Sequence, residues 1–175
     1  MPTANTATTR TTRAAPARKD KEAPDALTLL TQDHDEVKKL FKKYEKLVKA
    51  EAGAQEREAL ANQICLLLTV HAQIEEEIFY AAAREVLPEA DLVDEATVEH
   101  ASAKDLIAQI ESMTADDDLY DAKVTVLGEY IEHHVKEEQE EMFPKLRRRI
   151  DIKAVGAELL ARKQELMEGK AVLAH

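Results

Sequence analysis

The chain has 175 residues, of which 45% are hydrophobic and 34% charged, and its formal net charge is −11. Four glycines and five prolines are too few for a fibrous chain or a turn-rich all-β fold. No apolar run approaches the ~20 residues that span a bilayer, and Cys65, the single cysteine, cannot form an internal disulfide. We therefore expect a soluble, cytoplasmic protein that does not bind membranes.

Residues 1–24 differ in composition from the remainder of the chain. Their first nineteen positions contain Arg10, Arg13, Arg18 and Lys19 but no acidic residue. They hold almost no large apolar side chain that could offset the entropy lost on ordering, so we expect a disordered basic arm. The rest of the chain is strongly acidic and would repel phosphate backbones, which disfavours nucleic-acid binding by the folded body.

Apolar residues recur at helical spacing through the rest of the chain. The first stripe ends before Gly53, the second before Pro88, the third at a turn over residues 114–118, and the fourth near Pro144. A short fifth helix is expected at about 152–168. The four longer stripes run over Leu27–Val48, Leu60–Ala81, Val93–Met113 and Tyr120–Met142.

Four long helices joined by short loops predict an all-α, up-and-down antiparallel four-helix bundle. We assign the bundle to residues 25–150, and a C-terminal helix and tail to residues 151–175. The last helix would pack either on the flank of the bundle or on another subunit of a homodimer.

Each of the four stripes is interrupted by one histidine that faces the expected core. Glu75 and Glu138 follow two of these histidines at four residues, which places each pair on one face of its helix. Counted from the loops, at ~1.5 Å per residue, the histidines fall within about two turns of one level. The residues that converge are His34, His71, Glu75, His100, His134 and Glu138.

Burying this set without a partner would cost several kcal/mol for each unpaired charge. A single core histidine is usually just hydrogen-bonded, but four at one level with two carboxylates favour a metal site. Imidazole and carboxylate ligands without thiolate suit non-haem iron, manganese or zinc. Six ligands exceed the needs of one tetrahedral zinc ion, so we expect a dinuclear site.

His133 is the main ambiguity in this ligand set. It shares a helix face with Tyr130 and Glu137, whereas His134 shares the more apolar face of Ile131 and Glu138. We therefore assign His134 to the metal and His133 to the flank of the site.

At these residues the chain resembles the bacterial hemerythrin-like proteins of the HHE cation-binding group. The resemblance covers roughly residues 25–150. The matching segments are Asp33-His34-Asp35, His71 to Phe79 with Glu75, Val98-Glu99-His100, and His133 to Pro144 with Glu138. It implies a di-iron centre with an oxo or hydroxo bridge, in which the four histidines are terminal ligands and Glu75 and Glu138 are bridges. Zinc or manganese could substitute for iron.

Two departures bear on what such a centre would do. The oxygen carriers of the family have a fifth histidine where this chain has Lys104, and their last carboxylate stands where this chain has Gln139. Reversible oxygen carriage is therefore not the favoured function. A missing ligand leaves an open position that favours reaction with peroxide, nitric oxide or oxygen.

The resemblance therefore implies a metal-binding protein that binds or responds to oxygen, peroxide or nitric oxide, or that senses or stores iron. A di-iron enzyme that decomposes peroxide is the alternative, with Lys104 or Tyr130 as the candidate acid–base group. A ferritin-like protein would need Glu-x-x-His pairs, and the sequence contains none. A metal-free interaction protein fits poorly with buried carboxylates.

Overall fold

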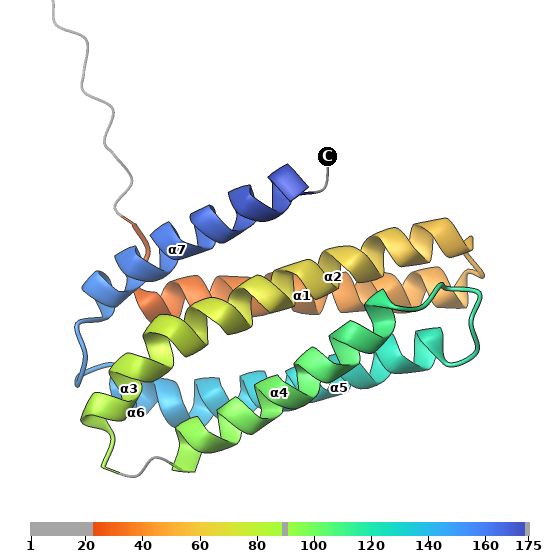
Figure 1. Ribbon diagram of the computed structural model, residues 1–175. Coiled ribbons are helices and arrows are strands. Elements are labelled where there is room, and N and C mark those ends of the chain that lie inside the picture. The colour runs from red at the N-terminus through yellow and green to blue at the C-terminus, as the bar shows by residue number, and fades with distance from the viewer. Residues whose placement is uncertain (1–22, 89–90, 174–175) are drawn as a thin grey trace, which may run out of the picture.

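The computed structural model describes residues 23–88 and 91–173, and the described residues form helices joined by short loops. The predicted basic arm lies outside these residues, apart from its last two positions. Four long helical rods build an antiparallel bundle, and a further helix lies across one side of it (Figure 1). The predicted all-α, up-and-down bundle is thus confirmed.

The first helical hairpin consists of α1 (Ala26–Lys49) and a rod that begins with α2 (Ala54–Ile74). Asp25 caps α1 by accepting a hydrogen bond from the backbone N–H of Thr28 at 3.0 Å. The second rod continues without a break through a π-helical turn, η1 (Glu75–Phe79), into α3 (Tyr80–Val86).

The second hairpin repeats this plan. It consists of α4 (Asp91–Glu111) and a rod made of α5 (Tyr120–Glu137), a second π-helical turn, η2 (Glu138–Met142), and α6 (Phe143–Leu146). Leu119 adopts a left-handed conformation with φ 72° just before α5, which lets the chain reverse direction there. Both π-helical turns start at a glutamate of the predicted metal site.

The C-terminal helix, α7 (Ile152–Leu173), packs on the flank of α1 and α2 and extends five residues beyond its expected end. Gly156 permits the close approach, because a Cβ atom there would lie only 2.5 Å from the carbonyl oxygen of Pro24. Leu159 is fully buried at this contact. Of the two positions considered from the sequence, the helix therefore occupies the flank.

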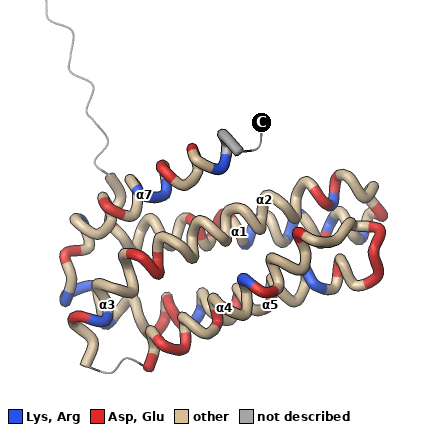
Figure 2. The backbone as a smooth tube through the Cα atoms, in the orientation of Figure 1, with Lys and Arg blue, Asp and Glu red and all other residues tan. Residues whose placement is uncertain are grey.

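Acidic and basic residues are distributed along the length of the long helices (Figure 2). None of the described helices offers the continuous apolar length that a bilayer crossing requires.

The apolar core is divided into two clusters. One surrounds Leu30 and Phe79 at the α3, α6 and α7 end, and the other surrounds Ile64 and Leu127 at the opposite end. Cys65 is buried in the second cluster and serves as a small core residue. Between the two clusters lies a polar layer that crosses all four rods, and this layer is the candidate site.

Candidate metal centre

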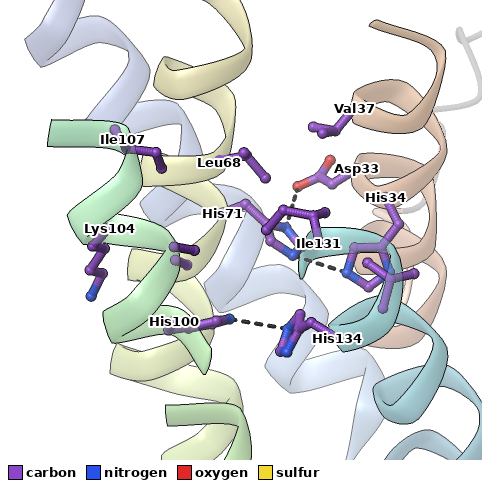
Figure 3. Close-up of a pocket in the computed structure, with 13 residues that line it drawn as sticks. Asp33, His34, Val37, Leu68, His71, His100, Lys104, Ile107, Ile131 and His134 are labelled. Carbon is purple, nitrogen blue, oxygen red and sulfur yellow. Dashed lines mark hydrogen bonds and ion pairs between the residues drawn. The ribbon is translucent and has the colours of Figure 1, made fainter. Parts of the chain in front are cut away.

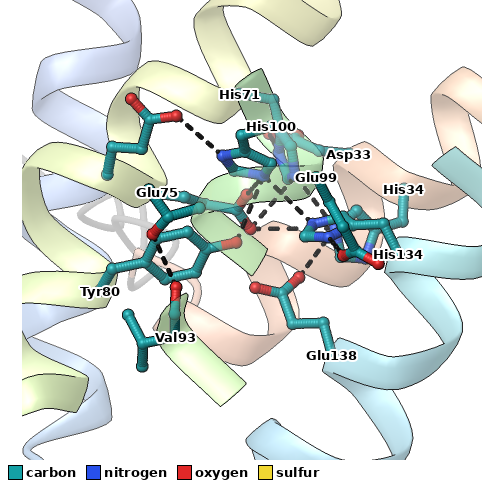
Figure 4. Close-up of polar contacts among 12 residues, drawn as sticks. Asp33, His34, His71, Glu75, Tyr80, Val93, Glu99, His100, His134 and Glu138 are labelled. Carbon is teal, nitrogen blue, oxygen red and sulfur yellow. Dashed lines mark hydrogen bonds and ion pairs between the residues drawn. The ribbon is translucent and has the colours of Figure 1, made fainter. Parts of the chain in front are cut away.

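The structure brings all six predicted site residues into one buried layer, which we call the histidine layer (Figure 4). Each of the four rods contributes one histidine, and each π-helical turn contributes its first residue. None of the six is more than 7% exposed. The members of the layer are His34 from α1, His71 from α2, Glu75 from η1, His100 from α4, His134 from α5 and Glu138 from η2.

The imidazoles form two pairs that meet through their Nε2 atoms. The Nε2 atoms of His34 and His71 lie 3.0 Å apart, and those of His100 and His134 lie 3.1 Å apart. Glu75 stands between the pairs, with one carboxylate oxygen 3.2 Å from His71 Nε2 and the other 3.3 Å from His100 Nε2. Glu75 is therefore placed so that its carboxylate can contact two ions at once.

Glu138 approaches the layer from the other π-helical turn. Its Oε2 atom lies 3.4 Å from His34 Nε2. No carboxylate oxygen of Glu75 or Glu138 has a hydrogen-bond partner of acceptable geometry among the described residues. Two buried carboxylates without hydrogen bonds are costly unless something else satisfies them.

The pKa values in the layer show the same cost of burying charged side chains. Burial raises the pKa of Glu138 well above its usual range, and the charge of Glu75 raises it further. Burial would also raise the pKa of Glu75, but the neighbouring His71 and His100 hold it well below its usual range. Burial lowers the pKa of His34 to about 3, and the neighbouring charge of His71 acts in the same direction.

A metal ion would offset the cost of burying these side chains, because carboxylates and neutral imidazoles are its natural ligands. The ligand atoms form two groups that share Glu75, namely His34, His71 and Glu75, and Glu75, His100 and His134. Within each group the atoms lie within 4.8 Å of one another. The residues present therefore fit a metal centre, and the shared carboxylate fits two ions better than one.

The outer nitrogen of every histidine is held by a residue next to a member of the layer. Asp33 Oδ2 lies 3.4 Å from His71 Nδ1, and the Gln139 amide lies 2.9 Å from His34 Nδ1. Glu76 Oε1 lies 3.0 Å from His100 Nδ1, and Glu99 Oε2 lies 2.7 Å from His134 Nδ1.

These contacts run around the bundle in a closed circuit. Each rod positions the imidazole of its neighbour, so no histidine is oriented by its own helix alone. Such outer contacts fix which ring nitrogen faces the metal. Gln139, which occupies the alternative carboxylate position, thus supports His34 from outside the histidine layer.

The π-helical turns bring in two aromatic residues that α-helical periodicity does not predict. The backbone N–H groups of Tyr80 and Phe143 bond to the carbonyls of Glu75 and Glu138, five residues earlier. The Tyr80 hydroxyl consequently lies 3.3 Å from His100 Nε2, and the Phe143 ring stacks on His34 with centroids 6.2 Å apart. π-helical turns of this kind are frequent at functional sites.

A small cavity adjoins the histidine layer on the side of the second apolar cluster (Figure 3). Its volume is about 20 Å³, which is room for one water molecule or a similarly small ligand. The four histidines border it, and its other walls include Val37, Leu68, Ala103, Ile107 and Ile131.

Two residues considered as acid–base groups from the sequence do not reach the layer. Lys104 borders the cavity, but its amino group is 2.6 Å from Glu76 and points away from the imidazoles (Figure 3). Tyr130 is 49% exposed. His133 also lies outside, 65% exposed and 3.1 Å from Glu137.

The C-terminal helix contributes to the centre through Lys163, whose amino group forms a short hydrogen bond to Asp33. Lys163→Met would leave Asp33 without this partner and loosen its hold on His71. We expect metal affinity to fall roughly tenfold, as is typical when a residue that orients a ligand is lost. Competition with a chelator measures the change.

Lys170→Met is the matched control for this variant, because it removes the same charge about two turns farther along α7. If both variants bound metal equally well, the contact between Lys163 and Asp33 would have no role in the centre.

The fold and the donor set together define a four-helix bundle protein with a cation-binding centre. The sequence matches the family model of the hemerythrin HHE cation binding domain over residues 25–146. The chain belongs to this family, and it therefore binds metal.

One solved structure supports the fold. The chain is similar to the crystal structure of a hemerythrin HHE cation binding domain-containing protein from Mycobacterium kansasii, with 22% sequence identity and a TM-score of 0.70. The alignment covers 86% of this chain and 91% of the other. No curated protein matches the chain.

Proposed function

We propose that the histidine layer holds two iron ions and that the adjoining cavity admits one small ligand, such as oxygen, peroxide or nitric oxide. The observation that carries the proposal is the cavity of about 20 Å³ beside four imidazoles, in a layer whose central carboxylate is shared by two ligand groups. A pair of iron ions would supply a redox-active centre able to bind such a ligand and exchange electrons with it.

The chain's own residues explain why the ligand would be small. Val37, Leu68 and Ile107 exclude bulk water and leave no room for an organic substrate. Lys104 stands where the family's oxygen carriers have a further histidine, and its ion pair with Glu76 keeps it from replacing that ligand. A metal ion held by the layer would therefore bind the small molecule on the side of this cavity.

A second candidate function is the decomposition of peroxide, in which two molecules of hydrogen peroxide yield two of water and one of oxygen. The observation that favours it is Tyr80, which is 3% exposed with its hydroxyl 3.3 Å from His100 Nε2. Burial raises the pKa of Tyr80, so its hydroxyl stays protonated and can donate a hydrogen bond at the centre.

Metal analysis and ligand titration test the proposal. We expect two irons per chain and a change in the absorption spectrum when the reduced protein meets oxygen or nitric oxide. Ala103→Val would fill the cavity without touching a metal ligand, and it should keep both irons but weaken the response to nitric oxide by about tenfold or more.

Ala61→Val is the control, because Ala61 is a buried alanine of the second apolar cluster that borders neither this cavity nor any other opening at the centre. Stoichiometric zinc in the purified protein would contradict the di-iron centre. An unchanged response in Ala103→Val would contradict the role of the cavity. Release of oxygen from peroxide would select the second function over simple binding.

A further inference from the structure

A second group of potential metal ligands lies on the outer surface between α4 and α5. His133 Nε2 is 3.1 Å from Glu137 Oε1 and 3.7 Å from Glu99 Oε1. The ligand atoms of Glu99, His133 and Glu137 all lie within 4.8 Å of one another. Their side chains are 29%, 65% and 38% exposed, so a cation could reach them directly from solvent.

This surface group is joined to the histidine layer through Glu99. One carboxylate oxygen of Glu99 faces His133, and the other lies 2.7 Å from Nδ1 of the buried His134. A cation held by the outer oxygen would therefore be separated from the centre by one carboxylate and one imidazole.

A small opening lies beside the surface group and reaches the histidine layer. Its volume is about 10 Å³. Glu95, Glu99 and Glu137 line its exposed part, and His134 and Glu138 line its buried part. Glu138 is 2% exposed, and neither of its oxygens has a hydrogen-bond partner among the described residues. The opening thus ends at a buried acceptor that lacks a partner.

We propose that Glu99, His133 and Glu137 form a separate surface site for a divalent cation, from which ions enter the histidine layer. One imidazole and two carboxylates bind Fe²⁺, Mn²⁺ or Zn²⁺ while leaving positions for water, as a transfer site requires. The four carboxylates and the one imidazole that line the opening would replace that water in sequence, and Leu92, Ala96 and Met142 complete its walls. The delivery role rests on the proposed function, whereas the surface site itself does not.

The surface site is tested with Mn²⁺ added to protein whose buried centre is already loaded. Electron paramagnetic resonance of the free ion should show one further Mn²⁺ bound per chain. The double variant His133→Ala, Glu137→Gln should weaken this binding by roughly tenfold or more, because two of three ligands are lost. Glu129→Gln, which removes the same charge from α5 outside the group, should bind as the wild type does.

Delivery is tested separately by mixing metal-free protein with Co²⁺ and following its visible absorption. The double variant should load several-fold more slowly than Glu129→Gln but reach the same final metal content. Absence of the additional Mn²⁺ in the wild type would overturn the surface site. Equal loading rates would overturn delivery alone, and a lower final content would contradict the ligand set of the histidine layer.

Discussion

Glu75→Ala is expected to lose both metal ions of the proposed two-ion centre and to destabilise the protein, since Glu75 lies between the two histidine pairs. Its two carboxylate oxygens contact different imidazoles, at 3.2 Å and 3.3 Å. Removing one partner of a buried charge pair costs about 3 kcal/mol, which corresponds to a fall of roughly 10 °C in the melting temperature of a domain this size. Loss of bound metal lowers stability further. Metal analysis and thermal denaturation of the reconstituted protein measure both effects.

His71→Ala should behave in the same way, because His71 faces both Glu75 and His34. The control is His133→Ala, which removes an imidazole next in sequence to His134 but outside the layer. It should retain both metals in the buried centre. Two metals in Glu75→Ala, or their loss from His133→Ala, would contradict the ligand assignment.

Glu138→Met is expected to have opposite effects on the two forms of the protein. Without metal, Glu138 is a buried carboxyl with one imidazole at 3.4 Å and no hydrogen bond to another described residue. Replacing it with an apolar side chain of similar size should stabilise the metal-free protein by about 1 kcal/mol. The same change removes a proposed metal ligand, so metal affinity should fall by more than about 100-fold, exceeding the loss typical of an outer contact.

Thermal denaturation with and without a chelator separates the two effects of Glu138→Met. Glu141→Met changes the same residue type on the exposed side of the same π-helical turn and should alter neither form. A lower melting temperature of metal-free Glu138→Met would show that this carboxyl stabilises the bundle by itself.

The bundle and the six members of the histidine layer could be found from the sequence because they depend on helical periodicity. Each histidine interrupts an apolar stripe, and loop positions place all four at similar heights. The sequence also contained a signal for the outer partners of the histidines, which are Asp33, Glu76, Glu99 and Gln139. Each is a polar residue directly beside a member of the layer, and that adjacency was the available signal.

Other parts of the centre depend on features that periodicity does not contain. Tyr80 and Phe143 face the layer because a π-helical turn places residues five apart on one side, whereas an α-helix places residues three or four apart there. Lys163 reaches Asp33 only because α7 folds back on α1, a tertiary contact between residues far apart in sequence. The length of α7 and its place on the flank were settled by the same packing.

The division of the apolar core into two clusters has a consequence for cooperativity. An uninterrupted core makes the two ends of a bundle unfold together, whereas here the ends meet across a layer of imidazoles and carboxylates. The continuous helical backbones couple the two ends of the bundle, and bound ions would couple them further. Loading the centre would therefore turn two weakly linked halves into one unfolding unit, and amide hydrogen exchange at both ends would slow together.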